Sequence, residues 1–465
     1  MSIKKNVNVK KYSFHLILLL IIKSIILMIF IEFSKADTTN PSNMSGGITT
    51  QFDQTKNAFS KPARNLPFQY KSKFAQGNAL FKTEWTPQKQ KETKFYGLGP
   101  TYTKSSCIGC HKRNGRSLPN NISDDKGFSF KINKALENNL SYGEQIDTNS
   151  VAGVEIEAKI KVSYEIIQGK YKDGTKYRLS KPIFHITKSS FGDIQGTVNA
   201  RIAPAIIGLG LISLIPEKII YNYADEHDLN NDGISGRVNI VFDPALKKNS
   251  IGRFGWKAST ASLMHQTAKA LHMDMGITSP FFLFNRCPDI QINCKNKQQN
   301  LEPEVDLETI RLLSFYSGSI GVPSHRNINS KKIKKGFKLF LKAKCNKCHI
   351  PFMETKKSTN KDFDFASNQK IQPFTDLLLH DMGKELQGIT INGTASSTEW
   401  RTAPLWGLGL IPTVNGEFRL MHDGRARSIA EAIIWHGGEG KISKNIFIKM
   451  NKKERNELLY FLKSL

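Results

Sequence analysis

Cysteine is scarce in this chain, with six among 465 residues, and four of the six fall within two five-residue segments. No C-x-x-C pair occurs outside these segments, which argues against a separate dithiol centre. Acidic residues are also few, 40 against 67 lysines and arginines, and the formal net charge is +27. No nucleic-acid-binding motif accompanies this charge. It therefore indicates either a generally lysine-rich composition or a positive face that attracts an acidic protein.

The two cysteine segments, residues 107–111 and 345–349, both read C-x-x-C-H, which is the attachment signature of a c-type haem. Two thiols one helical turn apart can add to the two vinyl groups of one porphyrin, and the adjoining histidine then supplies the proximal iron ligand. Zinc is the alternative, but each motif offers three ligands and a structural zinc site needs four. We therefore predict two covalently bound haem c groups. Their attachment residues are Cys107, Cys110, Cys345 and Cys348, and their proximal ligands are His111 and His349.

The N-terminal residues 1–36 have the pattern of a targeting segment. Four lysines precede residue 12, an apolar stretch follows from about residue 16 to residue 33, and small residues lead up to Ala36. This pattern predicts a signal peptide that is cleaved after Ala36. An uncleaved membrane anchor is the alternative, because the apolar stretch is near the lower limit for crossing a bilayer. Both readings export the chain, so we expect a periplasmic protein whose contact with the membrane is limited to this segment, and no nucleic-acid partner.

The rest of the chain predicts a mainly α protein with two cytochrome c-type haem domains, the first enlarged by insertions that include a small β-sheet. Residues 154–162 alternate apolar and polar as a strand does, whereas residues 334–343 form an amphipathic helical pattern that runs into the second motif. Residues 201–212 resemble residues 401–411, which indicates two related domains. The expected divisions are a mobile leader (37–75), an N-terminal haem domain with insertions (76–325) and a C-terminal cytochrome c domain (326–465).

Two cysteines remain outside the haem motifs, Cys287 and Cys294. An exported chain seldom keeps two free thiols this close together, so we predict a disulfide that closes a short loop. A loop of this length gains little chain entropy from the cross-link, so its role would be to shape the loop.

A family resemblance concerns the second axial ligand of the second haem. Residues 420–439 contain a His-x-Gly turn at His422 followed by a helical stretch, an arrangement that resembles the bacterial di-haem cytochrome c peroxidases. In that family a residue fourteen positions after this histidine, commonly methionine, ligates the second iron. Here that position is His436. The resemblance therefore implies a bis-histidine haem with His349 and His436 as iron ligands, and a lower reduction potential than a His/Met haem would have.

Other residues compete for this ligand position, and His422 itself is expected to brace the haem pocket. The rivals of His436 are Met382, His380 and Met421. A surface or capping role for His436 is the other alternative.

A closer resemblance extends from about residue 97 to residue 465. Residues 252–258, 274–279 and 376–383 are similar to the di-haem oxidoreductase branch of this superfamily, whose members are labelled peroxidases or thiol oxidoreductases by analogy. The resemblance implies a peroxidase in which electrons pass from the C-terminal to the N-terminal haem and reduce hydrogen peroxide. The expected donor is a small redox protein, an acidic cytochrome c or a cupredoxin. The alternatives are a non-catalytic electron-transfer cytochrome and an oxidase of a partner protein.

The distal side of the first haem is less determined by the sequence. His185, His265 and His272 are candidate ligands, and an empty position is the alternative that would allow peroxide to bind. Peroxide cleavage also needs a general acid or base, a glutamate in the peroxidases, for which Glu217 is the candidate by position. Trp256 or Trp406 could lie between the haems, although ordinary core tryptophans would give the same pattern.

Residues 228–237 resemble the start of a calcium loop. Asp228, Asn230 and Asp232 offer oxygens at positions one, three and five, and Gly233 at position six allows a sharp turn. The twelfth position is Asn239 and lacks the bidentate glutamate of an EF-hand. We therefore consider both a bound Ca²⁺ and a structural turn without an ion.

Overall fold

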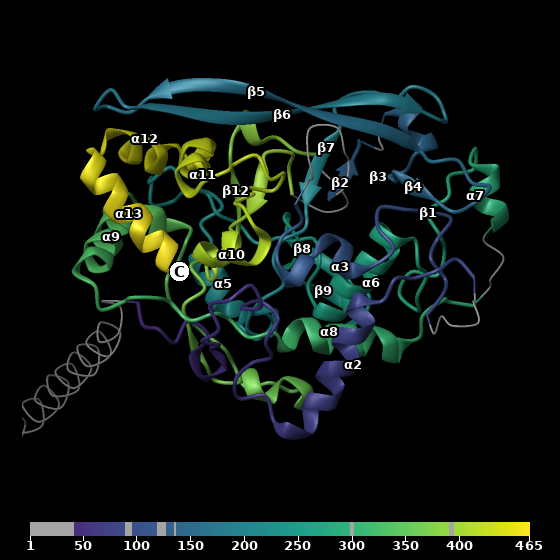
Figure 1. The fold of residues 1–465 in the computed structure, drawn as a ribbon, viewed down its shortest axis with the longest axis horizontal. Coiled ribbons are helices and arrows are strands. Elements are labelled where there is room, and N and C mark those ends of the chain that lie inside the picture. The colour runs from purple at the N-terminus through teal and green to yellow at the C-terminus, as the bar shows by residue number, and fades with distance from the viewer. Residues whose placement is uncertain (1–40, 89–94, 119–126, 134–135, 298–301, 390–394) are drawn as a thin grey trace, which may run out of the picture. The chain divides into compact units, whose positions relative to one another are not determined.

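Two pairs of crossing helices, one beside each C-x-x-C-H motif, organise the helical part of the protein (Figure 1). The computed structural model describes residues 41–88, 95–118, 127–133, 136–297, 302–389 and 395–465. The predicted signal segment, residues 1–36, lies outside these ranges. Within them, no helix has both the length and the apolar character needed to cross a bilayer.

The first pair consists of α2 (Lys71–Lys82) and α8 (Leu307–Ser319), and the second of α9 (Lys331–Lys342) and α13 (Lys452–Ser464). The other α-helices are α3 (Cys107–Cys110), α4 (Leu209–Ser213), α5 (Glu217–Tyr223), α6 (Leu263–Met275), α7 (Ile292–Lys297), α10 (Ile411–Asn415), α11 (Ile429–Trp435) and α12 (Lys441–Lys449).

Both helix pairs cross at a glycine, and the contacts there are equivalent. A Cβ atom on Gly77 of α2 would lie 2.6 Å from the Cβ of Tyr316 in α8, and one on Gly336 of α9 would lie 2.5 Å from the Cβ of Phe461 in α13. Only glycine allows backbones to approach this closely. The equivalence shows that the two halves of the chain use the same packing arrangement.

An aromatic contact repeats four residues after each of these glycines. The rings of Phe81 and Tyr316 are 5.3 Å apart, and those of Phe340 and Phe461 are 5.6 Å apart. All four residues belong to one continuous hydrophobic core. The two halves therefore share a core.

The prediction of a mainly α protein is wrong. Helices account for 34% of the structure and strands for 18%, the latter in several small sheets, so the fold is mixed. The strands are β1 (Thr101–Tyr102), β2 (Phe128–Lys131), β3 (Gln145–Ile146), β4 (Asn149–Ser150), β5 (Ala158–Lys170), β6 (Lys176–Ser189), β7 (Asn199–Ile202), β8 (Ile240–Asp243), β9 (Lys248–Ile251), β10 (Met353–Glu354), β11 (Lys370–Ile371), β12 (Leu379–Asp381) and β13 (Glu399–Arg401). Sheet order is β3-β2-β7 in the three-stranded sheet. The remaining strands pair as β1-β4, β5-β6, β8-β9, β10-β11 and β12-β13, and all the pairs are antiparallel.

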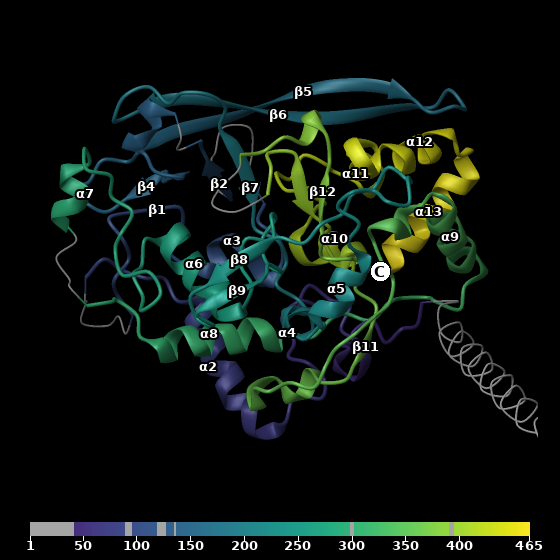
Figure 2. The same cartoon turned by 180° about the vertical axis from the view of Figure 1, so that it is seen from behind.

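The long β5–β6 hairpin arises from the alternating sequence pattern and connects the two halves. It extends along one side of the fold, past α11 and α12 at its tip (Figures 1 and 2). At the tip, Arg455 of α13 donates a hydrogen bond to Asp173 over 2.7 Å and lies 3.8 Å from the ring centre of Tyr171. Nearer the middle, the backbone N–H of Ser180 donates to Glu431 of α11. An insertion from the first half is therefore bound to the helices of the second.

The segment predicted as a mobile leader is packed against the rest of the chain from Ser42 onward. The backbone N–H of Gln51 donates to the carbonyl of Val322, and Ala58 and Phe59 are fully buried. By contrast, the predicted disulfide between Cys287 and Cys294 is confirmed, and it closes the loop before α7.

Candidate functional site

Both C-x-x-C-H motifs face the same cavity, which has a volume of about 540 Å³. The lining includes all six motif residues of the prediction, namely Cys107, Cys110, His111, Cys345, Cys348 and His349. The motifs share one backbone hydrogen bond, in which each histidine N–H donates to the carbonyl of the first cysteine over 2.9 Å.

The cavity cysteines are held as neutral thiols. Burial raises the pKa of Cys107, Cys110 and Cys345 to about 12. Each motif brings two thiols and one imidazole to the cavity, whereas a structural zinc site needs four ligands.

His349 and His436 face each other across the second half of the cavity. Their ring centres are 6.5 Å apart, and each Nδ1–H donates to a backbone carbonyl, of Phe374 over 2.9 Å and of Ala432 over 2.8 Å. Both Nε2 atoms therefore remain available. An imidazole nitrogen binds a transition metal at about 2 Å, so two imidazoles on one metal have ring centres roughly 6 Å apart. The pair thus has the spacing that one iron between them requires.

The protonation state of these histidines also suits ligation. Burial lowers the pKa of His349 to about 4 and lowers the pKa of His436. The neutral imidazole that results is the form that binds a metal.

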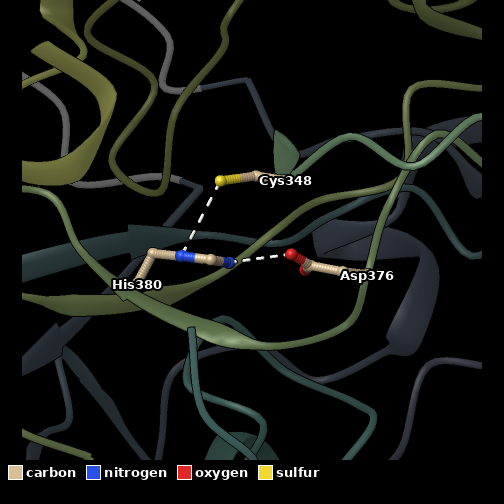
Figure 3. A group of neighbouring side chains, drawn as sticks. All are labelled: Cys348, Asp376 and His380. Carbon is tan, nitrogen blue, oxygen red and sulfur yellow. Dashed lines mark hydrogen bonds and ion pairs between the residues drawn. The ribbon is translucent and has the colours of Figure 1, made fainter. Parts of the chain in front are cut away.

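The rivals of His436 are placed differently. Met382 and Met421 line the cavity, but His380 has both ring nitrogens engaged: Nε2 with Asp376 over 2.8 Å and Nδ1 with Glu439 over 2.6 Å (Figure 3 shows the Asp376 contact). A histidine bound in this way has no nitrogen left for iron.

Buried basic side chains line the cavity and give it a strong preference for anions. They are Arg116, Lys131, Arg253, Lys257 and Arg401. Their hydrogen bonds go to backbone carbonyls or to the Gln145 amide, and among the described residues none forms an ion pair with a carboxylate. Burial lowers the pKa of the three arginines to about 10 and that of the two lysines to about 7. Buried cations without counter-ions are costly, and the propionate groups of haem would supply the missing negative charge.

These features define a site for two haem groups within one cavity. The model of the family described as "Di-haem oxidoreductase, putative peroxidase" matches residues 40–152 and 142–465, so the chain belongs to the di-haem oxidoreductase family. The protein is therefore a haem-dependent oxidoreductase. Comparisons with curated proteins and with solved structures gave no match.

The structure does not bring the three candidate distal histidines of the first haem to the cavity. His265 lies 3.7 Å from Asp243, and His272 stacks on Phe282 with ring centres 4.9 Å apart. His185 is exposed on strand β6. None of the three is part of the cavity lining, so none faces His111.

Helices α6 and α11 begin with the same N-terminal cap, although α6 has 13 residues and α11 has 7. Ser262 caps the N-terminus of α6 by accepting from the N–H three residues later, and Ser428 caps α11 in the same way. Eight residues after each serine, the chain has Ala270 in the first half and His436 in the second. Both line the cavity.

The turns before the two helices are equivalent as well. Phe254 pairs with Thr260 before α6, and Leu420 pairs with Ala426 before α11. This equivalence escaped the sequence analysis because few identical residues mark it, although the capping serines were a usable signal.

Glu217, the predicted acid–base residue, is exposed at the start of α5 and does not line the cavity. The position therefore gives no support to a role in proton transfer. Polar residues of α6 face the first half of the cavity instead, among them Gln266, whose side-chain carbonyl accepts a hydrogen bond from Thr260 over 2.7 Å.

Residues 228–233 form a tight turn. A side-chain oxygen of Asp228 accepts from the N–H groups of Asp232 and Gly233, and that of Asn230 also accepts from the N–H of Asp232. Asp232 forms an ion pair with Lys347 over 2.9 Å. These contacts connect the turn to the second haem motif without an ion, and calcium binding stays a prediction.

The aromatic residues singled out in the sequence lie at the cavity wall. Trp256 and Trp406 both line it, and the Trp256 indole N–H donates to the carbonyl of Ile202 over 2.7 Å. His422 stacks on Trp400 with ring centres 3.7 Å apart, and burial lowers the pKa of His422 to about 3. His422 is therefore a neutral wall residue.

Proposed function

We propose that this protein reduces hydrogen peroxide to water at the first haem, with electrons relayed from the second. The observation that carries the proposal is Ala270. It occupies the position equivalent to His436, and an alanine cannot bind iron. The first haem would then keep an open coordination position, whereas the second would be closed by two histidines.

The chemistry requires two electrons and two protons for each peroxide, which yields two waters. When bound, the haem groups supply the redox chemistry, and the chain has to orient the peroxide and provide protons. Gln266 is suited to orienting the peroxide, because Thr260 holds its carbonyl while its amide N–H group has no partner among the described residues. Lys131 is suited to providing a proton, because burial lowers its pKa to about 7 and it lines the same cavity.

Two tryptophans support an electron path between the haems. Trp256 and Trp406 line a cavity that also includes both motifs, and the hydrogen bond to Ile202 holds the Trp256 ring in place. Both side chains are therefore candidate relays between the second and the first haem.

We propose that an acidic redox protein donates the electrons in the periplasm. Helix α9 leads directly to Cys345 and exposes six lysines: Lys331, Lys332, Lys334, Lys335, Lys338 and Lys342. It contains no acidic residue, and within the described part of the chain only Lys342 of the six forms an ion pair, with Glu454 over 3.4 Å. This charge would attract a negatively charged donor to the surface beside the second haem.

The alternative is a non-catalytic electron carrier, which one observation favours. Met273 and Met275, near the end of α6, line the cavity, and a methionine sulfur can complete the coordination of a haem iron. In that case both irons would be closed and peroxide could not bind.

Low-temperature electron paramagnetic resonance of the haem-loaded protein distinguishes the two. We expect a high-spin ferric signal from the first haem, in the fully oxidised or the half-reduced protein, beside a low-spin signal from the second. Two low-spin signals in the oxidised state, with no high-spin species after half-reduction, would contradict the peroxidase and establish the carrier.

A further inference from the structure

His380 lies between two carboxylates beside the second haem motif. The side chain is only 3% exposed, its Nε2 is 2.8 Å from Asp376, and its Nδ1 is 2.6 Å from Glu439. The sulfur of Cys348 is 3.7 Å from the same Nδ1, on the side of the ring opposite Asp376 (Figure 3). This His380 cluster comprises His380, Asp376, Glu439 and Cys348.

One carboxylate is near the residue that hydrogen-bonds His349, and the other is on the segment that carries His436. Asp376 is two residues after Phe374, whose carbonyl accepts the Nδ1–H of His349. Glu439 is three residues after His436. The His380 side chain therefore connects the segment that holds one histidine with the segment that holds the other.

Other contacts hold the cluster rigidly. Glu439 also accepts hydrogen bonds from the N–H and hydroxyl of Ser235 and from the N–H of Asp381. Gly236 packs against the imidazole, since a Cβ there would be 2.5 Å from its Cε1 atom. The ring can neither rotate nor move away without breaking these contacts.

The geometry also determines the charge of the cluster. A carboxylate can only accept a hydrogen bond, so each His380 nitrogen has to donate, and the ring is an imidazolium. Burial disfavours this charged form, but the attraction and hydrogen bonding of Asp376 and Cys348 together raise the pKa of His380 well above its usual value. Two carboxylates and one imidazolium give the cluster one net negative charge next to Cys348, and the charge of Arg401 also acts on Asp376.

We propose that His380 is a positioning residue that holds both axial-ligand segments of the second haem and balances the charge of Asp376 and Glu439. The proposal rests on the proposed function in one respect, because it takes His349 and His436 as the ligands. Cys348, Asp376 and His380 are also close enough to hold a metal ion. That occupant is disfavoured, since both His380 nitrogens already donate to carboxylates and haem attachment consumes the Cys348 thiol.

The test uses the haem-loaded protein and three single variants, His380→Gln, Glu439→Gln and His265→Gln. Midpoint potentials of the second haem are measured by spectroelectrochemical titration, and its ligation by electron paramagnetic resonance. His380→Gln leaves two carboxylates unbalanced, which stabilises the ferric state, so the potential falls. Glu439→Gln removes a negative charge and keeps the side-chain shape, so the potential rises. His265 is a buried histidine beside a carboxylate outside the cavity, and its variant should leave the second haem unchanged.

The opposite signs separate this role from a general structural one, which would shift both variants in the same direction. Equal shifts of the midpoint potential in His380→Gln and Glu439→Gln, or no shift in either, would overturn the proposal. A change of similar size in His265→Gln would also overturn it. If His380→Gln fails to load haem, the shift in Glu439→Gln still decides, because a fall or no change there contradicts the charge balance. Failure of the peroxidase assignment would appear separately, as a closed first haem in the unmodified protein.

Discussion

Ala270 on helix α6 corresponds to His436, the residue that follows helix α11, by its distance from the capping serine. The two residues follow equivalent capping serines by eight positions, and both line the cavity that contains the haem motifs. Under the proposed function, this duplicated arrangement with one changed residue would give one closed and one open coordination position.

Replacing Ala270 with histidine should close the first haem. The new imidazole would lie where His436 lies in the second half, so the high-spin signal should become low-spin. Peroxide turnover should fall on the order of 100-fold, because peroxide would have to displace a bound ligand. Ala270→Ser, which is small and does not ligate, is the control. An unchanged spin state in the histidine variant would show that this position does not face the iron.

Replacing His436 with methionine should raise the potential of the second haem. A thioether stabilises Fe(III) less than imidazole does. The ferrous state therefore becomes more stable relative to the ferric state, and the potential rises. Potentiometry with optical detection measures the change, and the first haem of the same sample serves as the reference. A potential unaffected by the substitution would instead indicate one of the neighbouring methionines as the ligand.

Replacing Gln266 with leucine should lower kcat/KM for peroxide roughly tenfold, the effect of losing one hydrogen bond worth about 1.4 kcal/mol. The spin state of the first haem should stay the same, since Gln266 is not expected to ligate. Gln168→Leu, on the exposed surface of the β5–β6 hairpin, is a matched control. Equal rates in the two variants would exclude a substrate contact.

Turnover should decline as the pH rises through about 7, the value to which burial lowers the pKa of Lys131. The protonated amine is the donor, so activity is retained below this pH and lost above it. In Lys131→Met the rate should be lower, and the loss of activity with rising pH should be absent. If the decline of turnover with rising pH persists in the variant, another group donates the proton. The dependence of turnover on pH is measured from rates under saturating reductant.

The helix crossings predict a stability effect that is the same in both halves. Gly77→Ala and Gly336→Ala should each lower the free energy of unfolding by about 1–3 kcal/mol, because a methyl group overpacks the crossing. Lys335→Ala, on the exposed face of α9, should change it little. Chemical denaturation of the haem-loaded protein measures all three. A neutral Gly336→Ala would contradict the close approach of α9 and α13.

Local patterns predicted the parts of this protein that depend on residues near one another in the chain. The two C-x-x-C-H motifs, the Cys287–Cys294 disulfide and the family resemblance were of this kind. Family membership and the disulfide are confirmed. The separation of His436 from the His-x-Gly turn is also short, and the structure places this residue opposite His349.

Predictions that depended on long-range packing were the ones that failed or stayed open. The fraction of strand was underestimated because short strands form only when distant loops pair, as β7 does with β2. Glu217 and the three distal histidines were chosen by position along the chain, whereas the cavity lining depends on which face of each element points inward.

The sequence by itself therefore determined the cofactor chemistry, because a haem attachment motif spans a single helical turn and needs no tertiary contact to be read. Only the tertiary structure decided which side chains line the cavity that both motifs face. It brings Ala270 and His436, each eight residues after a capping serine, to the same cavity, and it places His380 between Asp376 and Glu439. Ala270 and His436 are distant in the chain, and so are His380 and Glu439. The physical reason for these contacts is the packing of the two halves around one cavity, because this packing alone selects which distant side chains meet.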